Sequence, residues 1–158
     1  MDFTIGITGH SEGFGKRIAK ECQRQGYEVL GFSRRSGYDI IFDVEKIFQH
    51  NLNVLINNAE VGNSQVNVAV QCHKHKIPCI NIGSKITEAS VYTVEDIIRK
   101  DNKVSLLNIS KELNQSYLTW GFLKGHSLLE ENPHLVETIT VDDAVKDVMN
   151  ELELILNS

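Results

Sequence analysis

The stretch ITGHSEGFGKRIAK, residues 7–20, sets three glycines between an apolar run and an amphipathic run. This change of pattern predicts a strand, a turn and a helix in succession. Gly9 can take the tight turn, and bare backbone at Gly13 and Gly15 lets a ligand approach the first turn of the helix. Amide N–H groups and the positive end of the helix dipole favour an anion there, usually a phosphate. The alternative is an ordinary glycine-rich connection.

Short apolar runs alternate with longer amphipathic runs along the rest of the chain. Most of the apolar runs have no polar face, which suits a parallel sheet covered by helices on both sides. We therefore expect an α/β fold, a Rossmann-type doubly wound parallel sheet of about six strands, in a single domain over residues 1–158.

The expected strands are residues 3–9, 28–33, 39–44, 53–59, 78–84 and 117–123. The expected helices are residues 14–25, 44–50, 63–75, 94–115 and 141–156, with a break near 101–102 left open. Thr93 stands three residues before Asp96, and Thr140 three before Asp143, which is the spacing of a capping box and predicts two of the helix starts.

The composition excludes several classes of protein. A net charge of −5 and a pI near 5.7 argue against a nucleic-acid partner, because phosphate binding needs clustered Lys and Arg. Cys22, Cys72 and Cys79 are too few and odd in number for a disulfide framework, so we expect a reduced, cytoplasmic protein. No apolar run approaches the roughly 18 residues of a membrane span, so no membrane partner is expected. His73 and His75 stand near two of the cysteines, but on different helix faces, and no metal site is expected.

Two motifs carry a resemblance to a known family. The spacing Thr8-Gly9-x-x-x-Gly13-x-Gly15 and the segment LINNA, residues 55–59, resemble the T-G-x-x-x-G-x-G and N-N-A-G motifs of the short-chain dehydrogenase/reductase family. Glu60 stands where the second motif has its last glycine, a departure that would crowd the ribose of the cofactor. The resemblance implies a nicotinamide dinucleotide cofactor bound by Thr8, Gly9, Ser11, Gly13, Phe14, Gly15, Asn58 and Ala59.

The resemblance also implies cofactor contacts further along the chain. Asp43 and Val44 match the acid that contacts the adenine ring and its neighbour, although Asp43 as a cap of the next helix is the alternative. Gly121 falls in the stretch that closes on the nicotinamide in the family, but the family's proline and threonine are both missing from residues 120–125.

The end of the second expected strand selects between the two dinucleotides. An NAD site usually places Asp or Glu there for the ribose 2′-hydroxyl, whereas an NADP site needs positive charge for the 2′-phosphate. Ser33, Arg34 and Arg35 follow this strand, and no acid occurs before Asp39. We therefore expect NADP, with NAD less favoured; two solvated loop arginines are the alternative.

The catalytic positions of the family are only partly matched. Its serine holds the substrate oxygen, its tyrosine exchanges the proton, its lysine lowers the pKa of the tyrosine and holds the nicotinamide ribose, and its asparagine anchors a water. The resemblance assigns Ser84, Lys111 and Asn67 to three of these positions, but Leu107 stands four residues before Lys111, at the tyrosine position.

Another residue must then supply the proton if the chain is an enzyme. Tyr92, in the loop after Ser84, is the preferred candidate, and His126 and Tyr117 are weaker ones. A tyrosine introduced at Leu107 should raise reductase activity if that position marks lost chemistry.

Two functions therefore stay open. The first is an NADP(H)-dependent oxidoreductase acting on a small carbonyl or alcohol substrate, and the second is a non-catalytic dinucleotide-binding or regulatory protein. A purely structural protein would need the glycines and arginines to be coincidental. The resemblance further implies a homodimer or homotetramer that pairs the helices of Asn67 and Lys111, which carry Val66, Val70, Leu106, Ile109 and Leu113.

Overall fold

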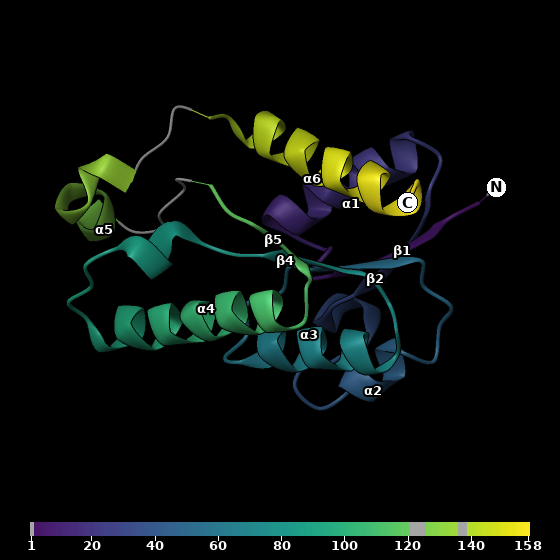
Figure 1. Ribbon diagram of the computed structural model, residues 1–158, viewed down its shortest axis with the longest axis horizontal. Helices are drawn as coiled ribbons and strands as arrows, with labels where there is room; N and C mark the ends of the chain where they lie inside the picture. Colours follow the sequence, from purple (N-terminus) through teal and green to yellow (C-terminus); the bar gives the residue numbers. More distant parts are fainter. Residues whose placement is uncertain (1, 121–125, 136–138) are drawn as a thin grey trace.

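The computed structural model describes residues 2–120, 126–135 and 139–158. Its centre is one sheet of five parallel strands in the order β2-β1-β3-β4-β5. The strands are β1 (Thr4–Thr8), β2 (Glu28–Phe32), β3 (Val54–Asn57), β4 (Cys79–Ile82) and β5 (Ser116–Leu118). The helices are α1 (Gly13–Arg24), α2 (Val44–Ile47), α3 (Ser64–Lys74), α4 (Val94–Glu112), α5 (His126–Glu131) and α6 (Val141–Leu156). Figure 1 shows α1 and α6 on one face of the sheet and α2, α3 and α4 on the other, which confirms the expected Rossmann-type doubly wound fold.

The central strands are buried on both faces, because successive side chains of a strand point to opposite sides. In β3, Val54 and Ile56 pack in the core formed with α1 and α6, whereas Leu55 packs in the core formed with α2 and α3. All three side chains are excluded from solvent. This double burial is why the strand sequences are apolar throughout rather than alternating.

Residues 39–44, expected as a strand, form a turn, and that prediction is wrong. Asp39 Oδ1 accepts a hydrogen bond from the backbone N–H of Ile41 at 2.9 Å, and Asp43 Oδ2 accepts one from the N–H of Asp39 at 2.8 Å. The two carboxylates satisfy backbone groups locally, which competes with strand pairing. Phe42, in the middle of this segment, is 83% exposed.

The loss of this strand accounts for the strand order. A dinucleotide-binding sheet with the order 3-2-1-4-5-6 takes the order seen here when its third strand is removed and the others are renumbered. The chain leaves β1 for α1 and leaves β3 for α3, on opposite faces of the sheet. A crevice therefore opens where the carboxyl ends of these neighbouring strands diverge, which is where such folds bind ligands.

Both expected capping signals are confirmed. Thr140 and Asp143 form a complete capping box at the start of α6, and the Thr93 side chain accepts from the N–H of Asp96 at 3.1 Å at the start of α4. Helix α4 runs without a break through residues 101–102. The last expected strand is shorter than expected, since β5 covers three residues and 121–123 lie outside the described residues. No helix within the described ranges has the length and apolar character needed to cross a membrane.

A network of buried amide side chains joins β3, β4, α3 and α4. Asn57 Nδ2 donates to Asn81 Oδ1 at 2.8 Å, and Asn81 Nδ2 donates to Ser110 Oγ and to Gln115 Oε1, both at 3.0 Å. Gln65 Nε2 donates to backbone carbonyls at the ends of β3 and β4, at 2.9 and 3.0 Å. Because these groups are paired, their burial does not carry the full cost of desolvation.

Candidate functional site

A cavity of about 570 Å³ opens at the carboxyl ends of β1, β3 and β4. Many of the residues predicted from the sequence line it: Gly9, Ser11, Gly13, Phe14, Ser33, Arg34, Arg35, Asn58, Ala59 and Ser84. The rest of its lining is Glu12, Glu60, Val61, Ile82, Gly83, Arg99, Lys103 and Trp120. We call the part lined by Ser33, Arg34 and Arg35 the β2 end, and the part lined by Glu60, Arg99 and Lys103 the α4 end.

The glycines of the first turn have different roles. Gly9 has a φ of +69°, which favours glycine, and a Cβ added there would lie 3.2 Å from Ala59. A Cβ at Gly15 would overlap the carbonyl of Gly9 and the side-chain amide of Asn58, so Gly15 serves the packing of the turn against β3. Gly15 does not line the cavity, so its predicted contact with a ligand stays a prediction.

Gly13 leaves space for a ligand at the start of α1. Its φ is +52°, and nothing lies within 4 Å of a Cβ added there. The neighbouring Glu12 makes no side-chain hydrogen bond to cap α1, whose first turn holds no acidic residue. The amide groups of this turn thus face an open part of the cavity, an arrangement that fits a dinucleotide phosphate.

Thr8 positions residues of the cavity lining through hydrogen bonds. Its side chain is fully buried, and Thr8 Oγ1 accepts hydrogen bonds from the backbone N–H of Asn58 at 2.9 Å and of Ala59 at 3.0 Å. Thr8 does not line the cavity. It instead holds the segment after β3 against β1, and so positions two residues that do line it.

The β2 end is positively charged and exposed. Ser33 begins the short 3-10 helix η1 (Arg34–Ser36), and its hydroxyl is hydrogen-bonded to that of Ser11. Arg35 pairs with Glu12 at 3.1 Å, but both side chains are more than 70% exposed, so the pair is weak and easily exchanged. Within the described residues Arg34 makes no ion pair.

His10 packs beside this end. Its ring lies where a side chain at Gly31 would stand, so the glycine in β2 is required by this contact. Burial lowers the pKa of His10, and its Nδ1 is buried with no hydrogen-bond partner among the described residues.

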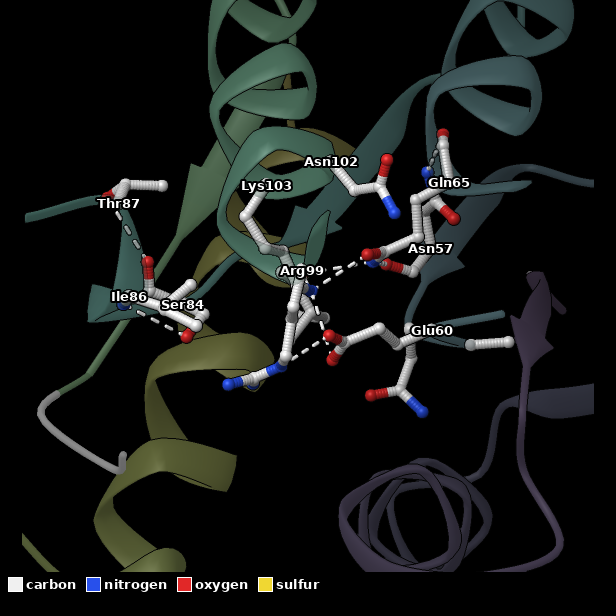
Figure 2. A network of polar contacts seen from close by, with 12 residues as sticks. Asn57, Glu60, Gln65, Ser84, Ile86, Thr87, Arg99, Asn102 and Lys103 are labelled. Atoms are coloured by element: carbon white, nitrogen blue, oxygen red, sulfur yellow. Dashed lines mark hydrogen bonds and ion pairs between the residues drawn. The ribbon is translucent and has the colours of Figure 1, made fainter. Parts of the chain in front are cut away.

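The α4 end is a cluster of ionic side chains (Figure 2). Lys103 is almost fully buried and donates from Nζ to Gln65 Oε1 at 2.7 Å and to the carbonyl of Ile82 at 3.0 Å. Glu60 accepts from Arg99 Nε at 2.6 Å and lies 3.6 Å from Lys103 Nζ. A buried ammonium group needs such partners, because an uncompensated charge in the interior is strongly destabilising.

Ser84 lies at the end of β4 beside a tyrosine. Ser84 is buried, and its Oγ accepts from the N–H of Ile86 at 3.2 Å, which caps the 3-10 helix η2 (Lys85–Glu88). Tyr117 Oη accepts from the N–H of Ser84 at 3.3 Å, and the Tyr117 ring fills the space where a side chain at Gly83 would lie. Burial is the main reason that the pKa of Tyr117 is raised.

The structure does not bring three predicted catalytic residues to this cavity. Lys111 is exposed in the last turn of α4, eight residues or about 12 Å along the helix from Lys103. Asn67 is exposed on α3, and Tyr92 is 71% exposed before α4. None of the three lines the cavity.

Two further predicted residues, Asp43 and Val44, also lie elsewhere. Asp43 closes the turn after residue 39, and the N–H of Asp39 and then Lys46 hold the pKa of its carboxyl below the usual range. Val44 is buried in the core under α2. Gly121 lies outside the described residues, and so does the side chain of His126, where α5 begins. The described parts of the chain contain no group of three or more His, Cys, Asp or Glu that could hold a metal ion.

Sequence reasoning missed the residues that form the α4 end. Arg99 and Lys103 have the four-residue spacing that the family gives to its tyrosine and lysine, so Arg99, not Leu107, holds the tyrosine position relative to a lysine in the cavity. Glu60 was noted only as a departure from a motif. The available signal was the negative charge of Glu60 together with two cations four residues apart, Arg99 and Lys103, on one face of α4.

The fold matches that of several solved enzymes. The chain shares its fold with solved short-chain dehydrogenase/reductases and with related reductases and epimerases. A dTDP-4-dehydrorhamnose reductase from Clostridium acetobutylicum superposes with a TM-score of 0.69 at 16% identity, over 97% of this chain and 71% of that chain. A short-chain dehydrogenase/reductase from Brucella ovis superposes with a TM-score of 0.67 at 14% identity, over 93% of this chain and 91% of that chain.

Two other similar structures hold a cofactor. One is a dTDP-4-dehydrorhamnose reductase from Bacillus anthracis in complex with NADP, with a TM-score of 0.57 at 19% identity over 75% of this chain and 52% of that chain. The other is an enzyme of Bordetella bronchiseptica in complex with NAD, with a TM-score of 0.57 at 12% identity over 76% of this chain and 53% of that chain. This chain thus spans about half the length of each. No protein-family model and no curated protein matches the sequence.

Proposed function

We propose that this chain binds NADP(H) in the cavity and uses it to interconvert a carbonyl compound and an alcohol. The observation that carries the proposal is the cavity itself, which joins an open helix N-terminus, two exposed arginines and a buried lysine at the switch point of a dinucleotide-binding fold. The phosphates would lie over Gly13 and the 2′-phosphate beside Arg34 and Arg35.

The bound cofactor would supply the hydride, so that reduction of one carbonyl consumes one NADPH and one proton and yields the alcohol and NADP⁺. Ser84 would hold the carbonyl oxygen. Tyr117 would supply the proton to that oxygen: it does not itself line the cavity, but its phenol accepts from the backbone N–H of Ser84, which does. Lys103 would hold the nicotinamide ribose in place of Lys111.

The second candidate is a dinucleotide-binding protein without reductase activity. It is favoured by Arg99 at the tyrosine position, since a guanidinium stays protonated at all ordinary pH values and cannot exchange a proton. The same cofactor would bind at the same glycine-rich turn in both cases, so NADP(H) binding is the first property to test.

Titration with NADPH and NADH tests the common part of the proposal. A hydrogen bond to a charged group contributes about 1.5–3 kcal/mol, so two arginines on the 2′-phosphate should favour NADPH at least tenfold. The double variant Arg34→Ala/Arg35→Ala should lose this preference and leave NADH affinity unchanged. Arg24→Ala is the matched control, because Arg24 is an exposed arginine paired with Glu21 outside the cavity. Equal affinities for both cofactors in the natural chain would contradict the assignment.

A further inference from the structure

We propose that the α4 end of the cavity binds an anionic group of the substrate, a carboxylate or a phosphate, and that the guanidinium of Arg99 is its anchor. The inference rests on the proposed function, because the substrate would enter this end beside bound NADP(H). It assigns a substrate class to a carbonyl reductase whose substrate is otherwise undefined.

The charge of the lining is the first observation. Four basic residues and two acidic residues line the cavity, Arg34, Arg35, Arg99 and Lys103 against Glu12 and Glu60, although the whole chain has a net charge of −5. The arginines of the β2 end match the 2′-phosphate of the cofactor. The cations of the α4 end, Arg99 and Lys103, belong to a different helix and outnumber its one carboxylate, Glu60.

The geometry of Arg99 is the second observation. Only its Nε is used within the described residues, in the 2.6 Å bond to Glu60, and its two terminal nitrogens have no hydrogen-bond partner there. Figure 2 shows the outer edge of the guanidinium directed away from Glu60. The side chain is 21% exposed, so a ligand can reach it while much of its stem is already desolvated. This edge can donate two parallel hydrogen bonds to a carboxylate or a phosphate.

The environment of Arg99 holds this edge in place. Asn102 Nδ2 donates to the carbonyl of Gly62 at 3.1 Å, and Lys103 is fixed by Gln65 and by the end of β4, so the middle of α4 is tied to the segment after β3 and to the end of β4. Glu60 orients the guanidinium through Nε. An anchor that is already ordered loses little conformational entropy when a ligand binds.

Glu60 also allows a test in which two variants should change the affinity for an anion in opposite directions. Its carboxylate lies close to both cations of the α4 end and would repel a second anion there. Glu60→Gln keeps an oxygen that can accept from Arg99 Nε but removes the negative charge. That variant should bind an anionic ligand more tightly, whereas Arg99→Met should bind it more weakly. If Glu60 and Arg99 had only structural roles, the two variants would not change the affinity for the anion in opposite directions.

The experiment compares carbonyl compounds that differ in one anionic group. Pyruvate is paired with methyl pyruvate, and glyceraldehyde 3-phosphate with glyceraldehyde, so that the two pairs separate a carboxylate from a phosphate. Dissociation constants are measured by calorimetry on the full chain saturated with NADP⁺, for the natural protein, Arg99→Met, Glu60→Gln and the control Lys100→Met. Lys100 is the next residue of α4, but its ammonium group bonds to the carbonyl of Ala89 and does not line the cavity.

We expect at least one anionic compound to bind about tenfold to a hundredfold more tightly than its neutral partner. Arg99→Met should remove this difference, Glu60→Gln should increase it, and Lys100→Met should leave it unchanged. Equal binding of the charged and neutral partners in both pairs would overturn the inference. So would an unchanged difference in Arg99→Met, or a loss of NADP⁺ affinity in that variant as large as the loss of anion affinity, since Arg99 would then serve the cofactor.

Titration with NADP⁺ alone separates failure of the inference from failure of the proposed function. If the natural chain binds NADP⁺ and does not discriminate between the partners of a pair, only the anion anchor is wrong. If the natural chain does not bind NADP⁺ at all, the proposed function is wrong, and the substrate site beside the cofactor is wrong with it.

Discussion

The double variant Arg99→Tyr/Glu60→Gly should convert the α4 end into an active site of the tyrosine–lysine type. It places a phenol four residues before Lys103, about 6 Å along the same face of α4. The ammonium of Lys103 favours the phenolate and so lowers the pKa of the new tyrosine toward the working pH. It also restores the glycine that ends the family's second motif, where Glu60 stands in the natural chain.

Both changes are needed for an electrostatic reason. Arg99→Tyr alone would leave Glu60 with Lys103 at 3.6 Å, and the carboxylate would oppose ionisation of the phenol. Removing both partners of the 2.6 Å pair leaves neither Arg99 nor Glu60 without the other, although Lys103 loses the carboxylate at 3.6 Å, a cost that the melting temperature reports. Lys103 keeps its bonds to the amide of Gln65 and to the end of β4.

The expected gain follows from proton transfer. A placed acid or base contributes about 10²–10⁴-fold to a rate, so the double variant should exceed the natural chain by at least tenfold on a neutral carbonyl. The substrate must be neutral, such as glyceraldehyde, because the variant has lost the anchor for an anion. NADPH oxidation is followed by absorbance, with the NADPH dissociation constant and the melting temperature measured on the same samples.

Leu107→Tyr is the matched control. It introduces the same phenol four residues before Lys111, but that lysine is exposed and outside the cavity, so no gain is expected. The reasoning would be refuted by a folded double variant that binds NADPH as well as the natural chain yet reduces nothing faster. It would also be refuted if Leu107→Tyr raised the rate as much, since Lys111 would then be the lysine of the site.

Tyr117→Phe should abolish any turnover of the natural chain at unchanged NADPH affinity, while Tyr92→Phe should change neither; a Tyr117 variant with full activity would exclude its phenol as the proton donor. Asp43→Asn should lower the melting temperature at neutral pH, with Glu45→Gln as control. Folding lowers the pKa of Asp43 from 3.8, so the ionised carboxylate stabilises the fold fully above pH 3.8. This stabilisation is lost as the pH falls through the folded-state pKa, so the natural chain and Asp43→Asn should have the same melting temperature in strong acid. Light scattering at micromolar concentration should give a dimer or a tetramer of the 17.8 kDa chain, and a monomeric mass would contradict that proposal.

The fold was largely predictable because its signals are local. The glycine-rich turn, the covered apolar strands and the threonine caps each report on a few neighbouring residues, and the turn, both caps and five of the six expected strands are found. The strand expected at residues 39–44 failed for a reason that apolar patterning does not show. Side-chain carboxylates at both ends of that segment bind its own backbone, and of the apolar residues between them only Ile40 is buried in the core, while Ile41 and Phe42 stay exposed.

The site was less predictable because it depends on distance along a helix. Periodicity says which residues share a face of α4, but it does not say which turn of the helix meets the end of β4. Lys103 and Lys111 both follow plausible patterns, and only the packing of α4 against α3 places Lys103 in the cavity. The approach of Tyr117 to Ser84 depends on the pairing of β5 with β4, with Gly83 as its only trace in the sequence.

The buried amide network has an evolutionary consequence. Each member of the chain from Gln65 through Asn57 and Asn81 to Gln115 satisfies another, so replacing one alone strands a donor or an acceptor in the interior. Such positions are strongly epistatic: a single change is selected against, while a joint change of two partners to apolar residues of similar shape can be nearly neutral. We therefore expect substitutions at these positions to occur in pairs. Related sequences that differ widely in their surfaces and loops should either keep all of these amides or lose them together.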